Sequence, residues 1–170
     1  MTTTRFAASA LAMGLVLPLA ADTADACSRI LWNDNGQANV VARTMDLYMS
    51  DEAEFVVSPR GVERSGQTGD GNAVSWSAAY GSAAITAFGL AATDGLNEAG
   101  LSANLLYLTG SEYDARDESL PGLSNVMLAQ YVIDNFATVA DAVEGLGKVQ
   151  VVATEVADRT WPLHLSLADA

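Results

Sequence analysis

Cys27 is the only cysteine in this 170-residue chain, and the small-x-small sequence Ala24-Asp25-Ala26 stands directly before it. The residues ahead of that sequence have the pattern of a secretory leader, because Arg5 supplies a positive charge and Phe6–Ala21 is apolar. This pattern predicts a signal peptide over residues 1–26, cleaved after Ala26. Cleavage would leave one residue with both a thiol and a free α-amine, a nucleophile with its own general base.

Three other interpretations of this segment stay open. The apolar run could be an uncleaved membrane anchor, but Pro18 interrupts it and it is shorter than the ~20 residues that a span needs. Cys27 could carry the lipid of a bacterial lipoprotein, although Ala24 and the charged Asp25 fit that processing signal poorly. The cysteine could also be incidental. A single cysteine cannot form an internal disulfide, so export would not imply a disulfide framework.

The composition is that of a globular protein with an acidic surface. The formal net charge is −13, which argues against nucleic acid and anionic lipid as partners. Half of the residues are hydrophobic, and there is no low-complexity tract. No second apolar span follows the leader. We therefore expect residues 27–170 to form one domain that is secreted or periplasmic and free of the membrane after cleavage.

Short β-strands are predicted first along the chain. Thr93–Gly100 is interpreted as a turn-rich link between two of them, because it contains Asp94-Gly95 and ends in Ala99-Gly100. The strands are expected at Ser28–Trp32, Asn39–Thr44, Glu54–Ser58, Val62–Arg64, Ser75–Trp76, Ser82–Phe88 and Leu101–Leu108.

The pattern changes after Pro121, where apolar residues recur at helical spacing from Val126 to Phe136. Thr138 and Asp141 resemble a capping start for a second helix that ends at Gly145–Gly147. Strands are expected again at Val149–Ala153 and Leu163–Leu167. Strands, then two helices, then strands predict an α+β layered fold. Because the chain stops soon after a strand, at Ala170, we expect a truncated product.

The first predicted hairpin brings charged groups toward Cys27. A turn centred near Asn35 would pair residues whose numbers sum to about 70, which places Cys27 opposite Arg43 within one residue and Asp46 just beyond. Arg43 could stabilise a thiolate, and Asp46 could orient the α-amine that takes up the thiol proton. The alternative is a surface hairpin with an ordinary Arg–Asp pair.

Three runs together resemble the choloylglycine hydrolase family, also called linear amide C–N hydrolases: Cys27-Ser28-Arg29, Ala42–Asp46 and Asp94–Leu101. This family of N-terminal-nucleophile (Ntn) hydrolases contains penicillin V acylases and bile salt hydrolases. The resemblance implies an αββα sandwich. Because the chain matches about the first half of a family member, the sandwich is expected to be incomplete, with its C-terminal half missing.

The resemblance also implies residue roles. Cys27 corresponds to the nucleophile, and Arg43 and Asp46 correspond to the arginine and aspartate beside it. Tyr107 falls near the oxyanion hole, where acylases carry an aromatic residue, although a tyrosine on a strand can also be plain packing. Leu47 replaces an aromatic residue of several Gram-negative members, which bears on the shape of the acyl pocket.

The activity implied is hydrolysis of an N-acyl amide such as penicillin V, an N-acyl homoserine lactone or a conjugated bile acid. It would require no metal or cofactor, and its partner would be that small molecule. Homo-oligomerisation of a full-length form stays open. One alternative is an inactive truncated fragment, because two further catalytic positions belong to the second half and an incomplete sandwich would expose sheet edges and apolar faces. Another alternative is a lipid-anchored periplasmic binding domain.

Other residue types in the chain point less clearly to chemistry. His164, the sole histidine, is expected to be packed or at a strand edge. The acidic cluster Asp51, Glu52 and Glu54 lacks the regular ligand spacing of a calcium loop. The Gly-rich segment Gly66–Asn72 lacks the Lys-Ser/Thr ending of a phosphate-binding loop.

Overall fold

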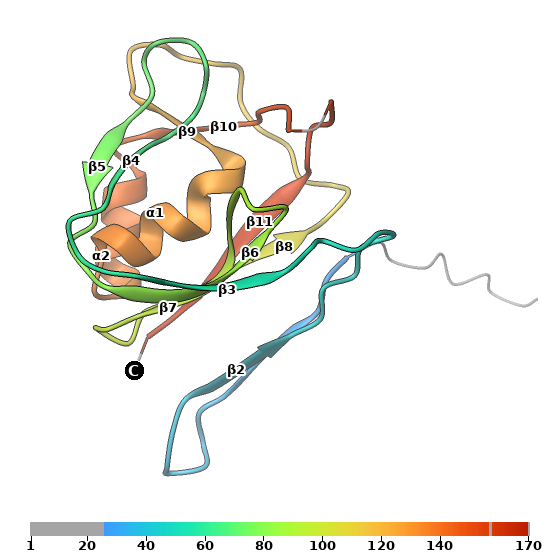
Figure 1. Cartoon of the computed structure of the whole chain (residues 1–170), viewed down its shortest axis with the longest axis vertical. Coiled ribbons are helices and arrows are strands. Elements are labelled where there is room, and N and C mark those ends of the chain that lie inside the picture. The colour runs from blue at the N-terminus through green and yellow to red at the C-terminus, as the bar shows by residue number, and fades with distance from the viewer. Residues whose placement is uncertain (1–25, 157, 170) are drawn as a thin grey trace, which may run out of the picture.

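A five-stranded antiparallel sheet forms the centre of the computed structural model, which describes residues 26–156 and 158–169 (Figure 1). The predicted leader lies outside these residues except for Ala26, so its cleavage stays a prediction. The strands follow the order β11-β8-β7-β6-β3 across the sheet. Their bounds are Glu54–Ser58 for β3, Ser82–Ala87 for β6, Ala91–Asn97 for β7, Ser102–Tyr107 for β8 and Leu163–Ala168 for β11.

Two short helices cover one face of this sheet (Figure 1). The first, α1 (Leu128–Asn135), follows a 3-10 turn at Asn125–Met127 and packs on β7 and β8. Its residues Ala129, Val132 and Ile133 are fully buried. The helical spacing predicted for this segment is confirmed, because one stripe of apolar side chains faces the sheet.

The second helix, α2 (Val139–Leu146), begins where the sequence predicted a cap. The side chain of Thr138 accepts a hydrogen bond of 3.1 Å from the backbone N–H of Asp141. This bond satisfies one of the backbone donors left free at a helix N-terminus. The helix ends before Gly147, within the predicted glycine-containing stretch. With strands before and after the two helices, the predicted α+β class is confirmed.

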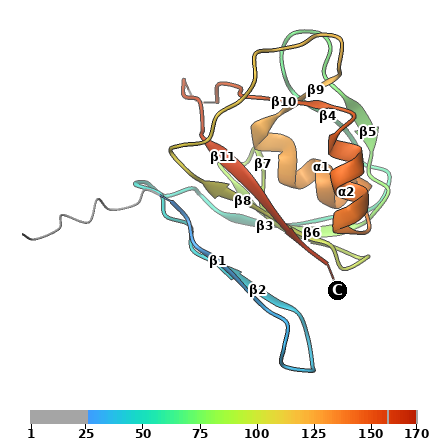
Figure 2. The same ribbon diagram turned by 180° about the vertical axis from the view of Figure 1, so that it is seen from behind.

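The first hairpin lies on the other side of the sheet from the helices (Figure 2). Its strands, β1 (Arg29–Trp32) and β2 (Val40–Arg43), pair with each other and form a two-stranded sheet of their own. Several of its apolar side chains are exposed, among them Ile30 at 65% and Trp32 at 56%. Phe55 on the edge strand β3 is exposed at 70%. Polar contacts from this hairpin to the large sheet are therefore important for positioning it.

Two further pairs of short strands lie around the helix layer (Figure 1). The antiparallel pair is β4 (Glu63–Ser65) and β5 (Ser75–Ser77). The parallel pair is β9 (Gly122–Ser124) and β10 (Gln150–Val152), of which β9 was not predicted. Within the described part of the chain, no helix has the length and apolar character needed to cross a membrane.

The predicted turn-rich link at Thr93–Gly100 is wrong, because most of it belongs to the central strand β7. Asp and Gly favour turns, but tertiary contacts outweigh that preference here. A Cβ atom added at Gly95 would overlap Cδ1 of Ile133, so glycine allows α1 to approach the sheet closely. Asp94 points to the opposite face, toward the hairpin, because side chains alternate along a strand.

Candidate active site

Cys27 lies against the end of the central strand β8. Its backbone N–H donates to the carbonyl of Tyr107 at 3.2 Å, and the N–H of Tyr107 donates to its Sγ at 3.4 Å. Ala26 forms an isolated antiparallel bridge with Leu108. The thiol is partly exposed and, within the described residues, is in no disulfide. The two residues that flank the predicted cleavage point are thus held beside the end of β8 by one isolated bridge and two hydrogen bonds.

The edge of β8 that receives Cys27 is left free by β7. The two strands pair only over Ser102–Asn104, although β8 continues to Tyr107. The pairing of β6 with β7 shifts register between Ile85 and Thr86, which leaves Thr93 as an extra residue. Such a bulge bends its strand, and β7 therefore departs from β8 beyond Asn104. The backbone groups of β8 beyond this point can then bind other partners.

The predicted hairpin register is wrong by two residues. Arg29, rather than Cys27, pairs with Arg43, which places the centre of the turn at Gly36 instead of Asn35. Gly36 adopts a positive φ of 67°, and the side chain of Asn35 accepts two N–H groups of the turn. The turn is thus centred one position later than predicted, and Cys27 lies beyond the paired residues.

Arg43 nevertheless reaches the same edge of β8 as Cys27. Its Nη2 donates to the carbonyl of Leu105 at 2.5 Å, and its Nε lies 3.4 Å from Oδ1 of Asp94. Its side chain is only 9% exposed. Leu105 and Tyr107 are two residues apart on one strand, so their carbonyls face the same edge about 7 Å apart. Arg43 and Cys27 are therefore neighbours along this edge, although no hydrogen bond joins them.

Asp46 is exposed, and in the described residues it makes no hydrogen bond to Cys27. It accepts a hydrogen bond of 2.9 Å from the hydroxyl of Thr44, and that hydroxyl accepts the backbone N–H of Ser28 at 3.0 Å. Asp46 is thus linked to the residue after Cys27 through Thr44. No local sequence pattern indicates this linking role, although Thr44 lies in the run Ala42–Asp46 that resembles the family.

Tyr107 and Leu47 both line an apolar cavity of about 70 Å³ next to this edge. The rings of Phe88 and Trp161 form part of its wall, with centroids 5.7 Å apart. Sequence reasoning missed these two rings, because they come from distant segments without a shared periodic pattern. The other lining residues are mostly apolar as well: Met45, Asp51, Ala87, Leu90, Ala91, Thr93, Leu105, Val126, Val156 and Leu163.

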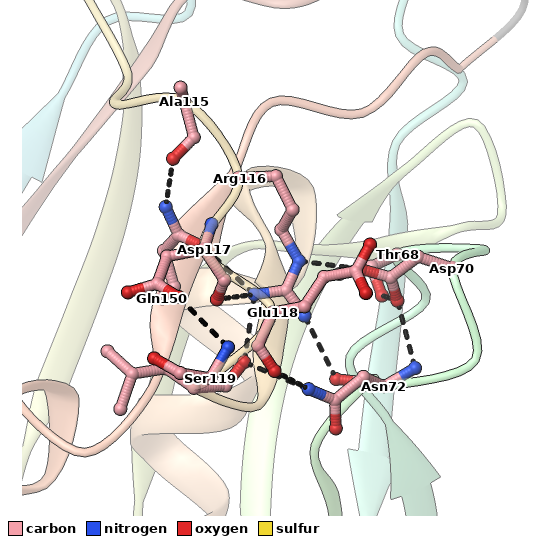
Figure 3. Close-up of polar contacts among 10 residues, drawn as sticks. Thr68, Asp70, Asn72, Ala115, Arg116, Asp117, Glu118, Ser119 and Gln150 are labelled. Atoms are coloured by element: carbon pink, nitrogen blue, oxygen red, sulfur yellow. Dashed lines mark hydrogen bonds and ion pairs between the residues drawn. The ribbon is translucent and has the colours of Figure 1, made fainter.

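The Gly-rich segment Gly66–Asn72 is held by an arginine (Figure 3). Nε of Arg116 donates to Oδ2 of Asp70 at 2.6 Å, and its other nitrogens bind carbonyls including that of Asn72. Hydrogen bonds from Thr68, Arg116 and the Asn72 backbone hold the pKa of Asp70 well below its usual range. These contacts join the two loops that contain Asp70 and Arg116, which is a structural role.

The sole histidine and the possible metal ligands are the remaining candidates. His164 is half-buried on the edge strand β11, opposite Leu106, as the expectation of a packed or edge position allows. Within residues 26–156 and 158–169, no three His, Cys, Asp or Glu side chains are grouped to hold a metal ion.

Comparisons with known proteins identify the family of this chain. Residues 27–170 match the family described as linear amide C–N hydrolases, choloylglycine hydrolase family. The chain is 38% identical over 180 residues to a penicillin V acylase of Pectobacterium atrosepticum, covering 98% of this chain and 48% of the relative. It therefore spans about half the length of the curated relative that it matches.

Solved structures give the same result for the fold. The penicillin V acylase from Agrobacterium tumefaciens superposes with a TM-score of 0.73 at 42% identity, over 83% of this chain and 43% of that one. A mutant of the conjugated bile acid hydrolase from Clostridium perfringens superposes with a TM-score of 0.69 at 20% identity, over 85% and 45% of the two chains, and shows the fold alone. The expected Ntn-hydrolase-like fold is confirmed, and the chain belongs to the choloylglycine hydrolase family of linear amide C–N hydrolases.

Proposed function

We propose that this protein hydrolyses N-acyl amides with an apolar acyl group, using Cys27 as an N-terminal nucleophile. One observation carries the proposal: the N–H of Tyr107 donates to the sulfur of Cys27, and Tyr107 also lines the adjacent apolar cavity. A nucleophile at the rim of an apolar pocket suits a substrate whose acyl group enters the pocket while its carbonyl carbon stays near the sulfur. Membership of an amide-hydrolysing family supports this reaction class.

In the proposed reaction, the α-amine of Cys27 takes the thiol proton and the thiolate attacks the amide carbonyl carbon. The C–N bond of the resulting tetrahedral intermediate breaks, and the departing nitrogen takes up a proton from the α-ammonium group. Water then attacks the thioester, releasing the carboxylic acid and restoring the thiol. Arg43 stabilises the thiolate, and backbone N–H groups stabilise the oxyanion.

Cleavage before Cys27 is essential to this mechanism, because an amide nitrogen cannot act as the base. Before cleavage, the Cys27 nitrogen is a peptide N–H that donates to the carbonyl of Tyr107. After cleavage the new amine could keep this acceptor and would remain next to its own thiol. Export to the periplasm or cell exterior, with removal of residues 1–26, is part of the proposal.

The acyl group is proposed to be hydrophobic, because the cavity next to Cys27 is lined mostly by apolar side chains. Penicillin V, N-acyl homoserine lactones and conjugated bile acids are the substrate classes to compare. The aromatic residue Tyr107 and the 38% identical penicillin V acylase favour the first class. The wall formed by Phe88 and Trp161 supports an aromatic or otherwise flat acyl group, because aromatic rings pack edge-to-face or offset.

The decisive experiment combines mass spectrometry of the mature N-terminus with hydrolysis of the three substrate classes. We expect a free Cys27 at the N-terminus and loss of hydrolysis in Cys27→Ser toward the uncatalysed rate. Diacylglycerol on the sulfur would support a lipid anchor instead, and undiminished turnover by Cys27→Ser would exclude the thiol as nucleophile.

A second pair of variants tests the requirement for cleavage. Ala26→Leu places a large residue directly before the cleavage point, and we expect an uncleaved, inactive protein. Asp25→Asn changes the middle position of the small-x-small sequence, which is not read by size, and serves as the matched control. Turnover by protein that retains the leader would contradict the proposal.

A further inference from the structure

The hairpin that carries Arg43 is joined to the central sheet by a small polar cluster. Arg29 and Arg43 are register partners on β1 and β2, so two guanidinium groups lie on adjacent strands. Like charges in this arrangement repel one another. Asp94 and Asn104, also register partners, occupy the facing sheet on β7 and β8. The hairpin therefore needs these two sheet residues in order to hold its arginines.

Each arginine has its own contact in this cluster. Nε of Arg29 donates to Oδ1 of Asn104 at 2.8 Å, and Nε of Arg43 lies 3.4 Å from Oδ1 of Asp94. Nδ2 of Asn104 donates to the same Oδ1 of Asp94 at 2.8 Å, which fixes the carboxylate. Thr93 donates to the other carboxylate oxygen at 3.2 Å. The carboxylate thus has a fixed orientation before it meets Arg43.

Because the cluster is partly shielded from water, losing one of its polar contacts costs more than losing a similar contact on the surface. The Arg43 side chain is 9% exposed and that of Asp94 21%. In the described part of the chain, Nη2 of Arg29 is buried without a hydrogen-bond partner. Burial lowers the pKa of Arg29 from its ordinary value. Arg29 is held by the amide of Asn104, whereas Arg43 is held by the Asp94 carboxylate together with the Leu105 carbonyl. Losing Asp94 or Asn104 would leave a partly desolvated guanidinium less well compensated.

We propose that Asp94 and Asn104 are positioning residues, which hold Arg43 on the β8 edge next to Cys27. This inference rests on the proposed function for its consequence in catalysis. Asp94 lies beside the point where β7 leaves β8. Its carboxylate therefore holds Arg43 at the position where the free edge of β8 begins. Its action on the thiol passes through Arg43, because in the described residues Asp94 makes no hydrogen bond to Cys27.

The main test measures the reactivity of the thiol directly. Cys27 is the only cysteine, so the rate of alkylation by iodoacetamide at neutral pH reports on this residue alone. We expect Asp94→Asn to slow alkylation several-fold, because a released guanidinium no longer stabilises the thiolate. If Asp94 instead acted on the thiol directly through its own charge, removing that negative charge would favour the thiolate and accelerate alkylation. An unchanged or faster rate would therefore overturn the inference.

Kinetics supply a second measurement. We expect Asp94→Asn to lower kcat by about 10- to 100-fold with KM changed less than twofold, because a small misplacement near the reacting atoms affects the chemical step. Glu54→Gln removes one negative charge from the edge strand β3 of the same sheet and serves as the matched control. A rise in KM with kcat unchanged would instead assign Asp94 to substrate binding and overturn the positioning role.

A double-mutant cycle decides whether Asp94 acts through Arg43. In an Arg43→Met background, Asp94→Asn should have almost no further effect on alkylation, because the group that it positions is gone. Additive effects would overturn the inference. If Asp94→Asn lacks a cooperative unfolding transition, Asn104→Ser is measured in the same way, with a smaller effect in the same direction expected.

The two proposals can fail separately. If wild-type protein hydrolyses none of the amides but the alkylation cycle shows coupling between Asp94 and Arg43, the proposed function fails and the positioning role stands. If hydrolysis depends on Cys27 while Asp94→Asn and Asn104→Ser leave alkylation and kcat unchanged, the positioning role fails and the proposed function stands.

Discussion

Gly95 and Ile133 meet at the closest approach between the central strand β7 and helix α1. A Cβ atom at position 95 would overlap Cδ1 of Ile133, and Ile133 is fully buried. The side chain therefore has little space into which it could move, because protein interiors are closely packed.

Gly95→Ala should destabilise the protein by about 1–3 kcal/mol through overpacking. Urea unfolding followed by circular dichroism would measure the change. Gly110→Ala is the matched control, because no atom of the described residues lies within 4 Å of an added Cβ there and its φ is not positive. Equal stability of the two variants would contradict the close packing of α1 on the sheet.

Asp134 is a fully buried carboxylate at the end of α1. Its Oδ2 accepts hydrogen bonds from Arg64 at 3.0 Å and from Trp76 at 2.8 Å, and its Oδ1 accepts one from Gln130 at 2.8 Å. Asp134→Ala leaves these donors without their acceptor, so we expect a loss of about 3–5 kcal/mol in the free energy of unfolding.

Glu144→Ala is the control for this effect. It removes a carboxylate that pairs with Lys148 at 2.8 Å on the exposed face of α2, where both side chains are at least 70% exposed. Ion pairs in water contribute little, so its stability should stay close to that of the wild type. A similar loss in both variants would show that burial is not the cause.

The Asp70 carboxylate should make the free energy of unfolding depend on pH under acidic conditions. Its pKa is lowered in the folded protein by hydrogen bonds from Thr68, Arg116 and the Asn72 backbone (Figure 3), whereas an aspartate in the unfolded chain has a pKa of about 3.9. The stabilising contribution is therefore fully present above the unfolded pKa and is lost as pH falls toward the folded pKa.

The test compares the urea midpoints of wild type and Asp70→Asn from pH 7 down to pH 3. Their difference should be constant above about pH 5 and should shrink below about pH 4. Asp114→Asn, at an exposed position in the sequence shortly before Arg116, is the control. A difference that stays the same at every pH would show that the Asp70 carboxylate does not contribute through its charge.

Leu47 should influence which acyl groups enter the apolar cavity. Leu47→Trp would fill part of the space of about 70 Å³, so kcat/KM for a bulky aryl-acyl amide should fall relative to that for a short-chain amide. A change of about tenfold or more in this ratio is expected, since one or two carbon groups have effects of that size in apolar pockets.

Val143→Trp is the control for the Leu47 substitution, because Val143 is 65% exposed on α2 and does not line the cavity. The two substitutions add similar volume at different places. An equal change in the ratio of kcat/KM values would exclude the cavity as the acyl site.

Local sequence patterns determined much of the fold. The N-cap at Thr138, the apolar stripe of α1 and most strands follow from rules that involve residues close together in the chain, because capping and periodicity are local effects. The family also follows from the sequence, through three short runs that include Cys27 and Arg43, because these runs keep their order and spacing in the chain.

Only the tertiary structure decided how these residues meet. Asp94-Gly95 has the local preference of a turn, yet Ile133 and Arg43 hold it in the middle of a strand from opposite faces. The free edge of β8, the cavity walls and the partner of Arg43 all depend on residues that lie tens of positions apart. Contacts between residues so far apart in the chain are set by how the sheet, helix and hairpin pack, and local propensity contains no information about them.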